Sequence, residues 1–247
     1  MPLLDHFRQP ILPRSWESFH CSWAVSIRNA FNRTLPKRFV AEAQVHLGTS
    51  VEADVAEFDR QPLTNGVKHP PRDEVDGSEG GTALAIAPPQ LSLIVPTRKL
   101  DRFAVEILDR DRDMRLAGVV EIVSPGNKDR PDSREMFLGK AAGYLLRGVG
   151  LVIADVVTSR LHNLHNELVT LEGASESQLM PGSPPIYASA YAPTPENGEE
   201  LRFDIWAHEL VLGESLPVMS LKVLGFGFVN VDLNATYQEA CEWSRLP

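Results

Sequence analysis

The chain contains 247 residues, of which 43% are hydrophobic and 23% are charged, so it is long and apolar enough to bury the core of one large domain. Its 24 basic and 33 acidic residues give a net charge of -9, which excludes a protein that holds nucleic acid through a broad basic surface. Two cysteines exclude a disulfide framework, and no apolar run approaches the roughly 18 residues of a membrane span, so we expect a cytoplasmic protein without membrane contact.

The N-terminal part of the chain predicts one helix followed by a hairpin. Apolar residues recur at helical spacing from about Ser15 to Pro36, where the proline ends the pattern. Residues 39–47 and 51–58 then have the composition of two short strands, and turn residues at 48–50 join them.

The next part predicts an insertion and a second hairpin. From residue 59 to about residue 90 the chain is rich in proline, glycine and charge, which predicts a flexible insertion that packs no core. A strand is expected at 91–95. Two similar apolar segments, 103–108 and 118–123, flank the charged segment 109–115 and predict a hairpin with a solvated tip. The aspartates of that tip lack the glycine and the closing glutamate of a calcium-binding loop.

A helix is predicted after this hairpin, from about Ser133 to Arg147. Asp132 has the position of its N-cap and Gly148 that of its stop. The apolar segment 151–157 predicts a buried strand, and a short amphipathic helix follows, with leucines at 161, 164, 168 and 171.

The C-terminal part adds strands and a closing helix, expected at 186–192, 201–206, 223–231 and 233–241. The order of elements predicts an α/β or α+β fold in which helices cover the faces of a mixed sheet. We expect a single domain over residues 1–247, with the elements of about 186–243 packed on the preceding core.

Two glutamates stand where a buried strand normally carries apolar residues. Glu106 and Glu121 lie in the middle of the two apolar segments of the second hairpin. If this hairpin folds about the midpoint between Asp113 and Met114, the two residues lie directly opposite each other, with Cβ atoms about 5 Å apart. Facing carboxylates repel each other unless a proton, a lysine or a metal ion offsets their charge.

Asp54 and Lys140 extend this site. Asp54 belongs to the predicted strand 51–58, which is expected to lie beside the second hairpin. Three carboxylates are suited to a hard divalent ion such as Mg²⁺ or Mn²⁺. Lys140 follows Met136 by four residues and precedes Tyr144 by four, so its side chain falls on or beside the apolar stripe of its helix, within reach of the acids.

The chain resembles an uncharacterised bacterial family, domain-of-unknown-function family 4058. The resemblance rests on the run VVEIVSPGNK from Val119 to Lys128, on KAAGY at 140–144 and on GVGLVIAD at 148–155. Segments near both ends of the chain agree with it, so it covers most of the sequence.

A shorter part of the chain, about residues 39–157, is similar to the Uma2-type endonucleases of the PD-(D/E)XK nuclease superfamily. This resemblance implies a restriction-endonuclease-like core over about residues 15–172, extended by C-terminal strands. It also implies that Asp54 and Glu121 hold magnesium and that a lysine orients the attacking water. Val123 occupies the usual lysine position, and Lys140 on the following helix takes the place of that lysine.

The activity that this resemblance implies is metal-dependent hydrolysis of a phosphodiester bond, with nucleic acid as the substrate. A divalent ion lowers the pKa of a bound water and stabilises the charge that develops on the phosphate. Lys140 would orient the water, Glu106 would act as an auxiliary acid, and Lys128 and Arg134 would contact phosphate oxygens.

The same residues also have a structural interpretation. Glu121 can be a buried carboxylate that pairs with Lys140 or with an arginine and specifies the fold. Glu106 can meet Arg102 or a solvated sheet edge, and Glu42 can be an exposed strand residue. The rival function is therefore a non-catalytic module that keeps the nuclease-like fold and binds a protein or nucleic-acid partner.

Overall fold

The structure is a computed structural model that describes residues 1–8, 16–44, 89–96, 105–196, 198 and 200–246. All of these belong to one compact unit, formed by Met1–Val45 and Ile86–Pro247. The predicted strand at 51–58, and with it Asp54, lies outside the described residues. The same is true of the predicted insertion apart from its last two residues.

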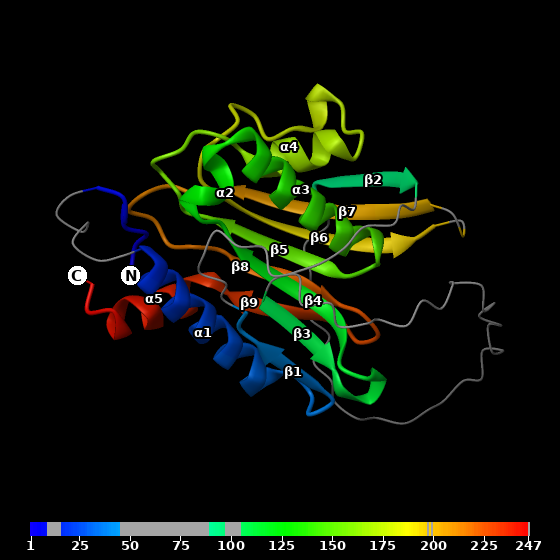
Figure 1. The fold of residues 1–247 in the computed structure, drawn as a ribbon, viewed down its shortest axis with the longest axis horizontal. Coiled ribbons are helices and arrows are strands. Elements are labelled where there is room, and N and C mark those ends of the chain that lie inside the picture. The colour runs from blue at the N-terminus through cyan, green and yellow to red at the C-terminus, as the bar shows by residue number, and fades with distance from the viewer. Residues whose placement is uncertain (9–15, 45–88, 97–104, 197, 199, 247) are drawn as a thin grey trace. The chain divides into compact units, whose positions relative to one another are not determined.

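The centre of this unit is a sheet of seven described strands, shown in Figure 1. In spatial order they are β1 (Phe39–Glu42), β3 (Val105–Asp109), β4 (Arg115–Ile122), β5 (Gly150–Asp155), β6 (Tyr187–Pro195), β7 (Glu200–Glu209) and β2 (Leu91–Pro96). Strands β4 and β5 pair in parallel and the other neighbours pair antiparallel. The mixed sheet and the helices that flank it confirm the predicted α/β class.

Five α-helices accompany the sheet in the described part of the chain: α1 (Trp16–Thr34), α2 (Pro125–Asp129), α3 (Pro131–Leu146), α4 (Leu164–Leu171) and α5 (Leu233–Trp243). The short helix α2 was not predicted. It begins where the Asn127 side chain accepts hydrogen bonds from the backbone amide and the hydroxyl of Ser124, at 2.9 and 3.0 Å. Helix α3 begins at Pro131 with Arg130 as its N-cap residue, so the predicted N-cap at Asp132 is wrong.

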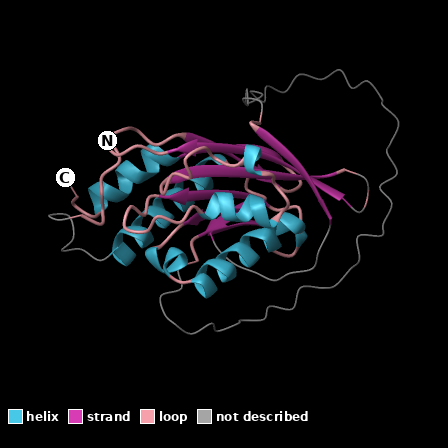
Figure 2. Cartoon of the chain, turned by 90° about the horizontal axis from the view of Figure 1, so that it is seen from above, coloured by secondary structure: helices cyan, strands magenta, loops and turns pink. Residues whose placement is uncertain are grey.

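The two faces of the sheet bury two separate apolar cores. Helices α1 and α5 pack together over one face, and α3 and α4 pack over the other, as Figures 1 and 2 show. The central strands supply both cores with alternate side chains: Val120 and Val152 face the first, whereas Val119 and Ile153 face the second. These strands are therefore apolar along their whole length.

A separate hairpin, β8 (Val218–Val223) and β9 (Gly227–Asp232), packs on the face that α1 and α5 cover. The strand predicted over 223–231 corresponds to β9 but begins later, at Gly227, because a turn occupies 224–226, and strand β8 was not predicted. Gly225 has φ +76° in this turn, a conformation that favours glycine. Beneath β8, Gly118 and Gly150 are paired on neighbouring strands. A Cβ atom on Gly150 would lie 2.1 Å from the carbonyl oxygen of Lys222, so the two backbones meet here without a side chain between them.

A side chain closes the outer edge of β1. The Asn32 amide nitrogen donates to the carbonyl of Ala41 at 2.9 Å, and the Asn32 amide oxygen accepts from the Ala41 N–H at 2.8 Å. Asn32 thus pairs with Ala41 as a neighbouring strand would. Among the helices described, none is long and apolar enough to pass through a bilayer.

Candidate functional site

Glu121 is held by two residues of helix α3. It lies near the end of β4, and its side chain is only 8% exposed. The Lys140 ammonium lies 2.9 Å from Oε1 and 3.0 Å from Oε2, and the Tyr144 hydroxyl donates to Oε1 at 3.4 Å. Lys140 and Tyr144 are four residues apart on one helix, so both side chains point to the same carboxylate. The charge of this buried acid is thereby offset.

Lys140 occupies a boundary position between the core and solvent. Its side chain is 24% exposed, and its ammonium lies 5.2 Å from the centre of the Phe137 ring, one helical turn earlier. The side chain thus lies partly against the Phe137 ring and partly in solvent, while its ammonium contacts the buried carboxylate.

Glu106 does not lie opposite Glu121, so the predicted register is wrong. Strand β3 pairs Glu106 with Val119, and a β-bulge shifts the register between Ile107 and Leu108. In the structure Asp109 pairs with Arg115, so the hairpin is centred on Arg112. The predicted centre, between Asp113 and Met114, is therefore displaced.

The three glutamates of this region nevertheless share one face of the sheet. Glu106 faces the same side as Val119 and hence as Glu121, from which it is a diagonal neighbour at about 7–8 Å. On its other side Glu106 is paired with Glu42 of β1. Exposure falls along the series, from exposed Glu42 through half-buried Glu106 to buried Glu121. The result is an acidic band that runs from the sheet edge towards Lys140.

Glu42 is exposed, as its strand position suggested. The pairing of β1 with β3 places Glu42 directly opposite Glu106. In the sequence, the only sign of this pair is an acidic residue on each of the two strands. Within the described ranges no group of three or more His, Cys, Asp or Glu side chains is arranged to hold a metal ion. The expected third acid of the predicted site, Asp54, lies outside those ranges.

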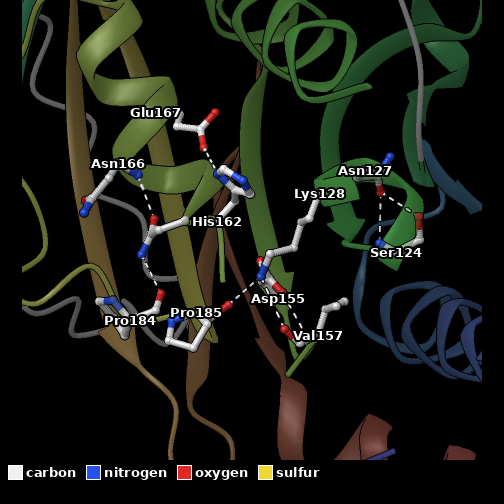
Figure 3. A network of polar contacts seen from close by, with 11 residues as sticks. Ser124, Asn127, Lys128, Asp155, Val157, His162, Asn166, Glu167, Pro184 and Pro185 are labelled. Carbon is white, nitrogen blue, oxygen red and sulfur yellow. Dashed lines mark hydrogen bonds and ion pairs between the residues drawn. The ribbon is translucent and has the colours of Figure 1, made fainter. Parts of the chain in front are cut away.

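Lys128 lies in the interior and not at the surface, which corrects its expected role as a phosphate contact. Its side chain is fully buried, as is that of Asp155 at the end of β5, and the two charges are 2.9 Å apart. The Lys128 ammonium also donates to the carbonyls of Pro185, at 2.6 Å, and Val157, at 3.3 Å, as Figure 3 shows. A phosphate in solvent cannot reach it in this arrangement.

The Lys128–Asp155 pair shows the electrostatic cost of burial. Loss of water raises the pKa of Asp155 to about 7, and the neighbouring Lys128 opposes this rise. Burial likewise lowers the pKa of Lys128. Sequence reasoning missed this pair, although an aspartate at the end of the otherwise apolar strand 150–155 was a visible signal.

Arg134 contacts an acid of another helix. Its Nε lies 3.3 Å from an oxygen of Glu167 on α4, and its side chain is 16% exposed. The second oxygen of Glu167 lies 3.2 Å from His162 Nδ1. Arg134 thus joins α3 to α4, and only a small part of its side chain faces solvent.

Comparisons of the chain with protein-family models, with curated proteins and with solved structures give no match. The functional proposal therefore depends on the geometry of Glu121 and its neighbours. The strongest feature of that geometry is the contact between the Lys140 ammonium and both oxygens of a buried strand carboxylate.

Proposed function

We propose that this protein is a divalent-metal-dependent phosphodiester hydrolase that acts on nucleic acid. The observation that carries the proposal is the contact between Glu121, on strand β4, and the partly exposed Lys140, 19 residues later on helix α3. A structural ion pair needs no access to solvent, whereas a water-orienting lysine does. The 24% exposure of the Lys140 side chain meets that requirement.

Glu121 would bind the metal and Lys140 would orient the attacking water. Carboxylate oxygens are the hard ligands that Mg²⁺ and Mn²⁺ prefer, and Glu121 and Glu106 supply them on one face of the sheet. When bound, the ion would activate water and stabilise charge on the phosphate. Lys140 would exchange part of its contact with Glu121 for a hydrogen bond to that water. Asp54 completes the proposed ligand set, as the resemblance to Uma2-type endonucleases implies.

The proposal includes the fold of the core and its family. An antiparallel hairpin, β3–β4, is followed by helix α3 and then by β5, which is parallel to β4. This arrangement supports a restriction-endonuclease-like core over about residues 15–172. Together with the sequence runs around Glu121 and Lys140, it supports relationship to domain-of-unknown-function family 4058 and to the PD-(D/E)XK nucleases.

Cleavage of labelled oligonucleotides with Mg²⁺ or Mn²⁺ tests this function. We expect cleavage by the wild type and a loss of at least about a hundredfold in Glu121→Gln and in Lys140→Gln, because each variant removes a group that acts in the transition state. Glu135→Gln is the matched control, since Glu135 is an exposed residue of the same helix. It should cleave like the wild type.

Thermal unfolding gives a second readout that does not depend on finding the right substrate. A metal that binds only the folded state raises the melting temperature by mass action. We expect Mg²⁺ or Mn²⁺ to raise it in the wild type and in Glu135→Gln, and not in Glu121→Gln.

The rival, a non-catalytic module, has one observation in its favour. Both oxygens of Glu121 already have partners in Lys140 and Tyr144, as in a structural ion-pair network. If metal leaves the melting temperature unchanged and no oligonucleotide is cleaved, the module is the correct description.

A further inference from the structure

The tip of the β3–β4 hairpin gathers basic side chains at one end of the sheet. A 3-10 turn at Arg110–Arg112 leads through Asp113 and Met114 into β4, and every residue from 110 to 115 is exposed. The segment 37–38 lies beside it, since the Arg110 N–H donates to the carbonyl of Arg38 at 2.8 Å. Residues 37–38 and 109–115 together hold five basic and three acidic side chains, a net charge of +2 on a chain whose net charge is -9.

Two of the three acids of this tip, Asp109 and Asp111, contact Arg38. Asp109 is buried and accepts hydrogen bonds from the Arg38 guanidinium and from the Asp111 N–H. The Arg38 hydrogen bond is the main reason why the pKa of Asp109 lies below its ordinary value. Asp111 lies 3.8 Å from the same guanidinium. In contrast, neither Arg110 nor Arg115 forms an ion pair with any described residue. Within the described ranges, no carboxylate neutralises these two charges.

An exposed aromatic ring stands near Arg38 and Arg112, the two arginines of the tip that also contact Asp109. Phe226, in the β8–β9 turn, is 50% exposed, and its ring centre lies 5.6 Å from that of Phe39. Arg38 lies 5.1 Å from the centre of the Phe39 ring. The preceding turn residue, Gly225, has Arg112 next to it, because a Cβ atom there would lie 3.5 Å from an Arg112 terminal nitrogen. Three chain segments thus place an aromatic face beside several guanidinium groups.

We propose that this tip, formed by Lys37, Arg38, Arg110, Arg112, Arg115 and Phe226, binds a single-stranded stretch of nucleic acid. Guanidinium groups bind the phosphates and an exposed aromatic ring stacks on an unpaired base, which is the combination that single-strand binding uses. A base can stack on Phe226 only when it is free of its own duplex. The local charge of +2 is also small for a surface that must hold duplex DNA through phosphates alone.

The inference rests on the proposed function, because it names the form of nucleic acid that the same molecule would cleave. Arg115 is the first residue of β4 and Glu121 the last but one, so their Cα atoms are six residue steps and hence about 20 Å apart along the strand. That span corresponds to roughly six nucleotide steps at the 3.4 Å spacing of a stacked strand. Phe226 belongs to the hairpin on the α1/α5 face, whereas the acidic band faces α3, so a strand bound at the tip must pass around the end of the sheet to contact both.

Binding of a fluorescent single strand, measured by anisotropy with the full chain in EDTA, tests the inference apart from cleavage. We expect the wild type to bind the single strand more tightly than the same sequence as a duplex. Arg110→Ser/Arg115→Ser should raise Kd by about tenfold or more and reduce the salt dependence of log K by about 1.4, the value for two phosphate contacts on a single strand. The control is Arg8→Ser/Arg245→Ser, which removes the same charge from exposed residues elsewhere and should leave Kd within twofold of the wild type, about 0.4 kcal/mol.

Phe226 gives an independent arm. Phe226→Ser should weaken binding by about tenfold, whereas Phe226→Trp should retain it, because tryptophan also stacks on bases. Circular dichroism and thermal unfolding identify any variant that fails to fold. A wild type that binds no strand in low salt, tip variants that bind like the control, or preference for the duplex would overturn the inference. Binding that persists without any metal-dependent cleavage would overturn the proposed function and leave the tip as a single-strand contact.

Discussion

Two glycines decide how closely the β8–β9 hairpin approaches the main sheet. Gly118 and Gly150 lie side by side on β4 and β5, and the backbone of β8 crosses above them. The approach is closer at Gly150 than at Gly118. A Cβ atom on Gly150 would meet the backbone carbonyl oxygen of Lys222, whereas one on Gly118 would first meet the Leu221 side chain. A backbone atom cannot move aside without shifting the whole strand.

We therefore expect Gly150→Ala to lower the free energy of unfolding by about 3 kcal/mol, as overpacking against a rigid neighbour does. Gly139→Ala is the matched control: no atom lies within 4 Å of the added methyl group, and the residue is inside helix α3. That variant should gain about 0.5–1 kcal/mol from helix propensity. Urea unfolding measures both. Equal stability of the two variants would contradict the close crossing.

His165 is a second residue whose surroundings predict a measurable effect. It is buried, its Nδ1 lies 2.6 Å from the Tyr191 hydroxyl, and burial lowers its pKa from 6.5 to about 4. The unfolded chain therefore binds a proton between these two values that the folded chain does not. This histidine contributes stability that is present above pH 6.5 and is lost as the pH falls towards 4.

Replacing His165 by glutamine should remove this pH dependence. As the pH falls from 6.5 to 4, the free energy of unfolding of the wild type should decrease by up to about 3 kcal/mol more than that of His165→Gln. The same substitution at half-exposed His162 is the control and should keep the wild-type profile. Urea unfolding at a series of pH values gives the comparison, and parallel curves for His165→Gln and the wild type would refute it.

At the scale of elements, the Lys128–Asp155 pair ties helix α2 to the end of β5 and to the loop at 184–185. Both side chains have 0% exposure, so each is the main compensation for the charge of the other. Removal of one partner leaves a buried charge, whereas removal of both leaves none.

Lys128→Met should therefore cost about 3–5 kcal/mol, and Lys128→Met/Asp155→Asn should cost clearly less than the two single substitutions added together. Lys37→Met, at an exposed position, should change stability by no more than about 0.5 kcal/mol. Chemical unfolding of the double-mutant cycle measures the coupling. Additive effects would show that the two charges do not compensate each other.

Elements with a strong local pattern were predictable, and their pairing was not. The helix from about Ser15 and the apolar strands around Glu121 have the expected places, because spacing alone marks them. The register of β3 against β4 was mispredicted, because the tip is organised by Asp109 and Arg38, which are 71 residues apart. Strand β8 and the turn that joins it to β9 were missed, since the turn at Gly225 lies within a run of mostly apolar residues.

The candidate site was predictable only where helical spacing decides it. Lys140 and Tyr144 are four residues apart, so their common direction follows from sequence, and Glu121 is marked as a charge in an apolar strand. The burial of Lys128 could not be predicted in the same way. Its partners, Asp155, Val157 and Pro185, come from later parts of the chain that only tertiary folding brings around it.

At the scale of the whole molecule, the two apolar cores share the same central strands. Neighbouring residues such as Val119 and Val120, or Val152 and Ile153, belong to opposite cores. Loss of either core removes the support of strands that the other core needs. The described unit should therefore unfold as one cooperative transition.

Three probes placed in the two cores test this prediction. Tryptophan fluorescence and thiol labelling of fully buried Cys241, in a Cys21→Ser background, report on the core under α1. Thiol labelling of Ala142→Cys, in a Cys21→Ser/Cys241→Ser background, reports on the core under α3, where Ala142 is buried. We expect one urea midpoint for all three. Separate midpoints would mean that the cores unfold independently.

The pairing of Asn32 with Ala41 has a consequence for self-association. Unsatisfied N–H and C=O groups on a border strand recruit further strands and seed aggregates. Here a carboxamide from α1 already occupies those groups at the rim of β1, so a second copy approaching from that direction finds nothing to bond with at this position. Asn32→Leu would leave the Ala41 N–H and C=O without these hydrogen bonds. We expect this variant to fold and then to form ribbon-like polymers.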